Sequence, residues 1–345
     1  MKKLIFSILI SSLLVSCKTT SVYVDVLKPA QITVNPGIKS IVFVNRSRPA
    51  KAERARNMLE GAITGEAPFA DRIGSEKCLE GAVARLNGSP RFTAALATDV
   101  ELKGTGTRQF PEPLDWDLIE GICKKYNSDA LVALEVFDSN NHYDVKEREA
   151  KKKENDKEIT YTEFRATLDV EVQAGWRIYY VKQHKIVDQN IFTDWKGWSS
   201  TSDAKKKAQQ GLPSQDRAVS DAGYYAGQQY AFRISPLWIR VSRMYYKKGN
   251  ADFDKAFRKA QTNDWQGAAD LWQKYANSSD QKIASYATYN LALASEMNGD
   301  LQGALEWARK SYVDYQNKKA RYYMNILEQR INDQQRLDEQ MKESE

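Results

Sequence analysis

Histidine is nearly absent from this 345-residue chain, which contains only His142 and His184. No CxxC, HxxxH or HExxH spacing occurs either. These absences exclude most zinc chemistry and most catalytic triads in which a histidine is the base. We therefore predict that the protein is not an enzyme and has no catalytic residue, no metal ion and no cofactor.

Cysteine is also scarce, because Cys17, Cys78 and Cys123 are the only three. Cys78 and Cys123 fall on two predicted helices. They could pair in an oxidising compartment or remain buried thiols, and buried thiols are the more common case. Cys123 lies on the apolar face of its helix, where burial would suppress a nucleophilic thiolate.

Neither sign of charge dominates the composition. The chain has 51 Lys and Arg against 45 Asp and Glu, a formal net charge of +6. Basic and acidic residues are mixed along the chain and form no basic stripe with interleaved aromatics. We therefore expect no nucleic-acid partner.

A hydrophobic run long enough to span a bilayer, about 20 residues, is missing as well. The longest apolar segment, 4–14, follows Lys2 and Lys3 and precedes the small residue Ser16. A short basic start, an apolar stretch and a small residue before a cleavage point are typical of a secretory signal peptide. We predict a signal peptide over residues 1–16.

The residues around that cleavage point carry the most specific motif in the chain. Leu14-Val15-Ser16-Cys17 resembles the lipobox of bacterial lipoproteins, in which the cysteine thiol receives lipid such as palmitate. The resemblance implies a membrane anchor on Cys17. No Asp and no acidic cluster follows Cys17, which in these lipoproteins implies the outer membrane with the body facing the periplasm.

Residues 17–36 are predicted to be the lipidated cysteine and a tether, and residues 37–198 an α/β domain. The expected strands are apolar or alternating, and the expected helices have apolar residues at 3.6-residue spacing. The predicted elements of this domain are a strand at 38–45, a helix at 77–86, a strand at 91–97, a helix at 115–126 capped by Asp115 and Asn127, and a buried strand at 130–137. A helical region between 45 and 65 is also expected.

The clearest strand pattern alternates from Phe164 to Tyr180, and a second strand at 186–198 completes an antiparallel hairpin. Residues 144–158 are rich in Lys and Glu without apolar spacing, which favours a solvated loop or an exposed helix. Residues 199–217 are predicted to be a linker. The remainder, 218–345, is predicted to be an all-α domain in which 237–246 begins a helix.

A polar cluster follows the buried strand at 130–137, where open α/β sheets bind ligands. Five of its residues have the spacing of a calcium-binding loop: Asp138, Asn140, His142, Asp144 and Glu149. However, Tyr143 stands where such a loop needs glycine, so an ordinary polar loop is the favoured interpretation.

The C-terminal part contains a repeat. Asn263-Asp264-Trp265-Gln266-Gly267-Ala268 recurs 36 residues later as Gly299-Asp300-Leu301-Gln302-Gly303-Ala304. A period near 34 residues (about one helix pair) resembles the tetratricopeptide repeat. Small and aromatic residues are expected to pack the helix pairs together: Ala256, Ala268, Trp272, Ala292, Ala304 and Trp307. The resemblance implies that the first helix of each pair forms a protein-binding face, although the repeats could merely brace the anchored domain.

The order of elements resembles the α/β domains of periplasmic envelope proteins such as the amino-terminal domain of the Tol translocation protein and the curli secretion subunit. The Lys28-Pro29-Ala30 segment, the strand at 41–45 and the repeats also resemble a family of Bacteroidota lipoproteins. These resemblances imply a protein-binding scaffold in the cell envelope, held to the membrane through Cys17. The alternative is a subunit of an oligomeric secretion or envelope-assembly complex, and the sequence leaves the oligomeric state open.

Overall fold

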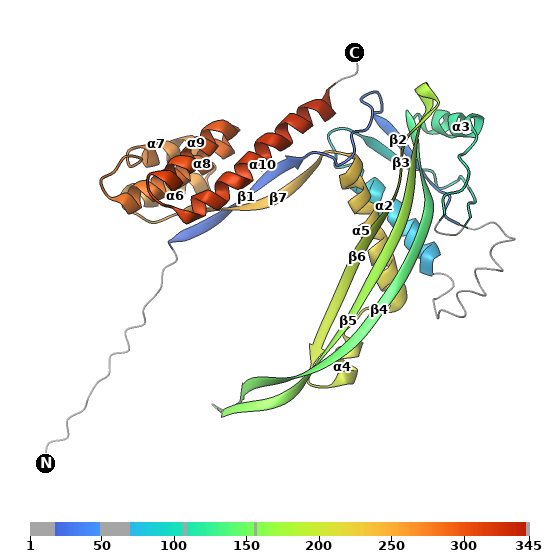
Figure 1. Ribbon diagram of the computed structural model, residues 1–345, viewed down its shortest axis with the longest axis horizontal. Helices are drawn as coiled ribbons and strands as arrows, with labels where there is room; N and C mark the ends of the chain where they lie inside the picture. The colour runs from blue at the N-terminus through green and yellow to red at the C-terminus, as the bar shows by residue number, and fades with distance from the viewer. Residues whose placement is uncertain (1–17, 49–69, 106–108, 155–156, 343–345) are drawn as a thin grey trace. The chain divides into compact units, whose positions relative to one another are not determined.

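The computed structural model describes residues 18–48, 70–105, 109–154 and 157–342 (Figure 1). Cys17 and residues 49–65 of the helical region expected between 45 and 65 lie outside the described residues. The described chain divides into two compact units. We call residues 27–238 with 336–342 the sheet unit, and residues 18–26 with 239–335 the helical unit. The predicted class, a mixed sheet with helices followed by an all-helical region, is confirmed.

The sheet unit contains a five-stranded sheet in the order β3-β2-β4-β5-β6. Its first three strands are parallel and its last three form an antiparallel meander. The strands are β2 (Ser40–Asn45), β3 (Thr93–Leu96), β4 (Ala130–Glu154), β5 (Lys157–Tyr180) and β6 (Lys185–Ser202), and a short 3-10 turn, η1 (Val181–Gln183), joins the last two. The predicted parallel α/β unit and the long hairpin are therefore confirmed.

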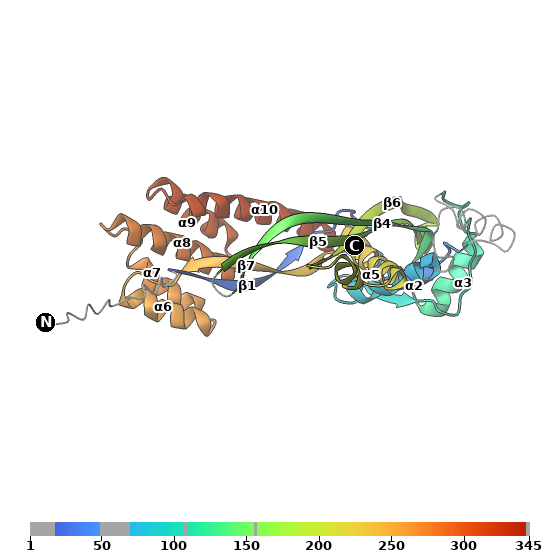
Figure 2. The same ribbon diagram turned by 90° about the horizontal axis from the view of Figure 1, so that it is seen from below.

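Helices cover the two faces of this sheet unequally. Helices α2 (Ala70–Leu86) and α5 (Gln215–Ile234) pack side by side on one face (Figure 2). Helix α3 (Trp116–Tyr126) covers the other face only around β2 and the first residues of β4. Its caps are those predicted, since the Asp115 carboxylate accepts the N–H of Asp117 and Asn127 is left-handed with φ 50°.

The prediction of a loop or helix over 144–158 is wrong. β4 continues to Glu154 and β5 begins at Lys157, so the described part of this charged run is an antiparallel ribbon. Both faces of the ribbon are exposed there, so its strands need no apolar alternation. Cross-strand ion pairs such as Arg148–Glu163, 2.6 Å, line it instead.

The predicted linker over 199–217 instead contains the end of β6, helix α4 (Lys205–Gln210) and the start of α5, and Ala208 is fully buried. Helix α5 belongs to the sheet unit and not to a domain that begins at residue 218. Its small residues resemble a repeat helix in sequence, but they pack on α2 and on the sheet, where Tyr230 stacks on Trp176 at 4.1 Å.

The helical unit contains two helix pairs that reproduce the repeat. The pairs are α6 (Ala251–Gln261) with α7 (Trp265–Gln273), and α8 (Gln281–Met297) with α9 (Leu301–Val313). Asp264 and Asp300 cap α7 and α9 in the same way, each accepting the N–H of the glycine three residues later. The preceding residues, Asn263 and Gly299, are both left-handed, with φ of 62° and 83°. The 36-residue sequence repeat is thus also a repeat of turn geometry.

The prediction of a helix at 237–246 is wrong, because this segment is strand β7 (Leu237–Tyr246). It pairs with β1 (Thr19–Lys28). The two strands are antiparallel, since Lys247 N–H donates to the Lys18 carbonyl at 3.0 Å while Arg240 pairs with Asp25 at 2.8 Å. The β-branched and aromatic residues of β7 favour a strand. The predicted tether over 17–36 is therefore interrupted by a strand that begins two residues after Cys17.

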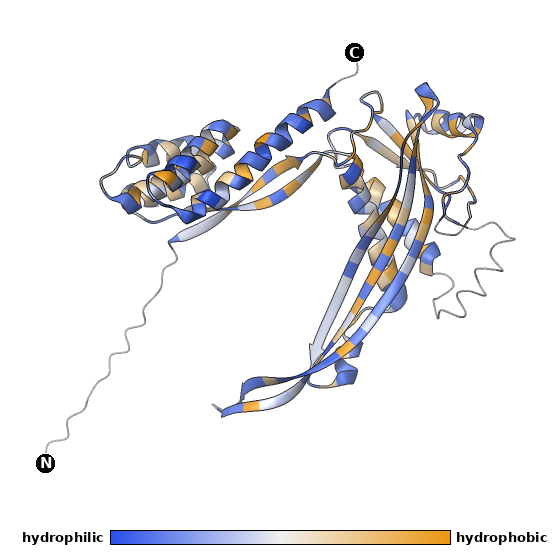
Figure 3. Ribbon diagram, in the orientation of Figure 1, coloured by the Kyte–Doolittle hydropathy of each residue, from blue (hydrophilic) through white to orange (hydrophobic). Residues whose placement is uncertain are grey.

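The last helix is α10 (Lys318–Met341), and most residues of its last turns are hydrophilic (Figure 3). Leu337 and Gln340, near its end, are nevertheless buried. The Gln340 amide accepts the Ala30 N–H at 2.8 Å and donates to the Ala30 carbonyl at 3.0 Å. Among the described helices, none has the length and apolar character needed to cross a membrane.

Candidate functional site: the open face of the sheet

The residues predicted to pack the repeats lie in the core of the helical unit. Trp307 is partly buried, and the other five are fully buried: Ala256, Ala268, Trp272, Ala292 and Ala304. They hold the helix pairs together.

The face expected to bind a partner peptide is occupied by β7 of the same chain. Tyr246 stacks on Tyr286 of α8 at 3.8 Å, and Tyr245 lies against Phe257 of α6. The buried Asn290 amide donates to the Tyr246 carbonyl at 2.7 Å and accepts the Tyr246 N–H at 2.8 Å. Asn290 thus satisfies both backbone groups, as a neighbouring strand would.

A buried ion cluster holds β7, α8 and α10 together within the helical unit. The Glu296 carboxylate is fully buried and accepts hydrogen bonds from Arg243 Nε (3.0 and 3.1 Å), Arg330 and the Tyr323 hydroxyl. Burial by itself would raise the pKa of Glu296, but these hydrogen bonds and the charge of Arg243 lower it. Glu296 is therefore an ionised structural anchor.

A second buried carboxylate, Glu135 of β4, lies against Arg46, Arg177 and Tyr179. Burial raises its pKa despite the two guanidinium groups. Arg177 also donates to the Pro111 carbonyl at 3.0 Å, so the cluster fixes the segment before α3 to the sheet. The charged groups of this cluster bind one another and the backbone, so the cluster has a structural role.

Neither described cysteine is placed to act as a nucleophile. Cys78 and Cys123 are free thiols in the cores on opposite faces of the sheet. Burial raises the pKa of Cys78 and raises that of Cys123 to about 12. In the part of the chain that the structure describes, no group of His, Cys, Asp and Glu could hold a metal ion.

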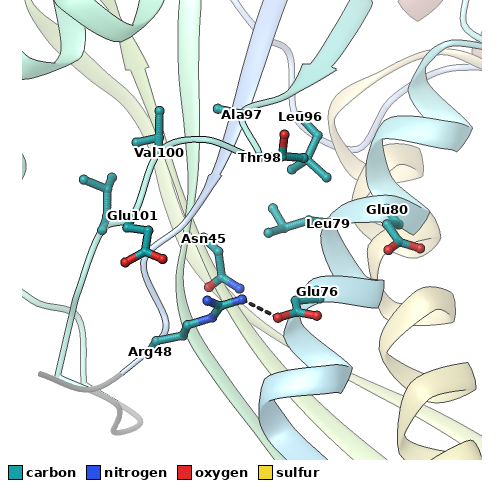
Figure 4. A pocket seen from close by; sticks show the side chains of 11 residues that line it. Asn45, Arg48, Glu76, Leu79, Glu80, Leu96, Ala97, Thr98, Val100 and Glu101 are labelled. Carbon is teal, nitrogen blue, oxygen red and sulfur yellow. Dashed lines mark hydrogen bonds and ion pairs between the residues drawn. The ribbon is translucent and has the colours of Figure 1, made fainter. Parts of the chain in front are cut away.

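A cleft of about 270 Å³ opens at the carboxyl ends of β2 and β3, beside α2 (Figure 4). Three of its polar side chains have partners at the cleft. Arg48 pairs with Glu76, and the Asn45 amide donates to Ser75 at 3.1 Å. The cleft lies below the size range of about 300–1,000 Å³ that is usual for ligand pockets. It is the place where open α/β sheets bind ligands, but its charges are not arranged around a ligand.

The polar cluster with calcium-loop spacing lies within β4 and is not a loop. In a strand, every second side chain points to the same face. Asp138, Asn140, His142 and Asp144 therefore form a row on one face of the sheet, and Glu149 points to the other. The spacing that resembled a calcium loop places these side chains side by side, so they cannot surround an ion.

That row belongs to a larger surface, which we call the open face. It is the side of the β4-β5-β6 ribbon that faces away from α5, on the part of β5 that precedes Gly175. It consists of alternate residues of the three strands: Asp138, Asn140, His142 and Asp144 of β4, Thr167, Asp169, Glu171 and Gln173 of β5, and Ile191, Thr193, Trp195 and Gly197 of β6. The exposed fractions of Ile191 and Trp195 are 41% and 52%, although both are large apolar residues.

The side chains of the open face contact one another. Glu171 lies opposite both Asn140 and Trp195 in the strand register. The His142 ring centre is 5.3 Å from that of Trp195, and its Nε2 is 4.0 Å from Glu171 Oε2. The surface thus combines an exposed indole with four carboxylates on a rigid three-stranded platform.

The comparisons with known proteins cover both the mixed sheet with its helices and the helical part that follows it. A family model described as a domain of unknown function, DUF8603, matches residues 38–246, more than half of the chain, so the chain belongs to that family. A second model described as a domain of unknown function, DUF6340, matches residues 254–329. None of the curated proteins matches the chain.

Proposed function

We propose that this is a lipid-anchored protein of the outer membrane, facing the periplasm, that binds a partner protein and has no catalytic activity. The observation that carries the proposal is the open face. A half-exposed tryptophan surrounded by polar side chains is typical of the centre of a protein–protein interface, where Trp, Tyr and Arg contribute most of the binding energy. Because Glu171 lies opposite Trp195 in the strand register and Asp138 and Asp169 are on the same face, the partner surface is expected to be basic around an apolar pocket.

The anchor part of the proposal is supported by the lipobox at Cys17. We expect that Cys17→Ser abolishes labelling of the protein by radioactive palmitate in bacteria. The matched variant Lys18→Ser changes the next residue and should be labelled like the unaltered protein. Undiminished labelling of Cys17→Ser would refute the anchor.

The partner part is tested by photo-crosslinking in cells from a light-activated residue placed at Thr193, between Ile191 and Trp195 on β6. We expect a discrete crosslinked product that is lost with Trp195→Ala, because the indole supplies the central contact. Trp238→Ala removes another exposed tryptophan, 51% exposed, and should leave the product unchanged. A product that persists in Trp195→Ala would contradict a role for the open face.

The same experiment distinguishes the alternative function, a subunit of an oligomeric envelope complex. β6 is an edge strand of 18 residues, none of them buried, and such an edge can pair with another copy of itself. In that case the crosslinked product is a dimer of this chain. A product that contains a different protein supports the scaffold.

A further inference from the structure

A group of lysines gathers where the chain enters the helical unit. The start of β1 and the end of β7 meet there, since Lys247 N–H donates to the Lys18 carbonyl at 3.0 Å. Lys282 lies on the first turn of α8, and its neighbour Ile283 packs close to the residues that follow β7, since a Cβ atom on Gly249 would lie 3.2 Å from Ile283 Cδ1. A hydrogen bond with Lys282, which requires one of the two amines to be neutral, and charge repulsion between the ammonium groups lower the pKa of Lys18.

Further cations extend this group, which we call the lysine cluster: Lys18, Lys247, Lys248, Lys282 and Lys319. Lys319 Nζ is 5.7 Å from the centre of the Tyr246 ring, directly before Lys247 in sequence. All members except the half-buried Lys247 are exposed. The neighbouring acid, Asp280, uses its carboxylate to cap α8 by accepting the N–H groups of Lys282 and Ile283.

Two ammonium groups held this close repel each other, and an anion between them would relieve the repulsion. The location of the cluster identifies the anion. Lys18 directly follows Cys17, and adjacent Cα atoms are about 3.8 Å apart. A lipid on Cys17 would therefore hold the cluster at the level of the phospholipid headgroups.

We propose that the lysine cluster binds the headgroups of anionic phospholipids and so seats the helical unit on the bilayer surface. The choice of a lipid headgroup as the anion rests on the proposed anchor at Cys17, whereas the test below measures lipid binding without that anchor. Basic residues near an anionic membrane surface contribute attraction that weakens with salt.

The test uses the protein without residues 1–17, so that no lipid is attached. We expect it to co-sediment with vesicles of phosphatidylcholine and phosphatidylglycerol, to release on addition of salt, and not to bind vesicles of phosphatidylcholine alone. The double variant Lys18→Gln, Lys282→Gln should bind at least about tenfold more weakly, because two cations that face the lipid are removed. Sodium phosphate should release the protein no better than sodium chloride of equal ionic strength.

The control double variant Lys206→Gln, Lys207→Gln removes two exposed lysines of α4 in the sheet unit and should bind like the unaltered protein. Equal loss in both double variants, binding to phosphatidylcholine alone, or selective release by phosphate would overturn the proposal. Failure of palmitate labelling at Cys17 would refute the anchor without affecting this result.

Discussion

Replacing Glu296 by alanine is expected to lower the free energy of unfolding of the helical unit by about 3–5 kcal/mol, the usual cost of removing one partner from a buried ion pair. Arg243, whose side chain is 9% exposed, would lose both of its carboxylate contacts. Tyr323 and Arg330 would each lose a hydrogen bond to the same carboxylate. The buried guanidinium would then have no counter-charge, so the loss would exceed that of an exposed ion pair several-fold.

Urea unfolding followed by tryptophan fluorescence measures this change. Glu306→Ala is the matched control, because Glu306 is exposed on α9, and it should change stability by less than about 0.5 kcal/mol. The lowered pKa of Glu296 adds a pH signature: its stabilisation is present above the unfolded carboxyl pKa of about 4.3 and is lost as the pH falls through the lower folded pKa. Equal stability losses for Glu296→Ala and Glu306→Ala would show that the ion cluster is not structural.

Gly227→Ala is expected to destabilise the sheet unit by about 1–3 kcal/mol or more, although alanine normally favours a helix. Helices α2 and α5 cross so closely that a Cβ atom on Gly227 would lie 1.8 Å from the Cys78 carbonyl oxygen. The obstacle is backbone and cannot rotate away. Gly223 and Gly81 make similar approaches, with a Cβ 2.3 Å from the Gly74 oxygen and 2.1 Å from the Tyr224 oxygen.

The control substitution is expected to change stability in the opposite direction. Gly121 lies on α3, where an added Cβ would meet nothing within 4 Å. Gly121→Ala should therefore stabilise the same unit by up to about 1 kcal/mol through helix propensity alone. Thermal unfolding of both variants compares the two effects, and a stabilised Gly227→Ala protein would refute the close crossing.

Local sequence patterns are sufficient to predict those helices and strands that bury one or both of their faces. The apolar runs of β2 and β4, the alternation of β5 and the caps of α3 all depend on local periodicity and turn chemistry. The charged ribbon at 144–154 was missed because both of its faces are exposed, so nothing in its composition marks it as a strand. β7 was missed because its partner, β1, lies more than 200 residues away in sequence.

The sequence indicated only part of the candidate site. The spacing of Asp138, Asn140, His142 and Asp144 marks them as a group. That spacing also occurs in loops, and it does not indicate that these residues lie on a strand. The alternation of β6 places Ile191 and Trp195 on one strand. It does not show that the described helices leave them uncovered, since coverage depends on where α2, α3 and α5 pack. The occupation of the repeat face by β7 depends on Asn290, whose role becomes visible only when Tyr246 is placed beside it.

The central claim is that the open face, and not the helical repeats, binds the partner. The most direct measurement compares photo-crosslinking in cells from Thr193 on the open face with crosslinking from Asp254, an exposed residue on α6, the first helix of the first pair. We expect a specific product from Thr193 and none from Asp254. A specific product from Asp254 alone would contradict the proposal and return the binding site to the repeats.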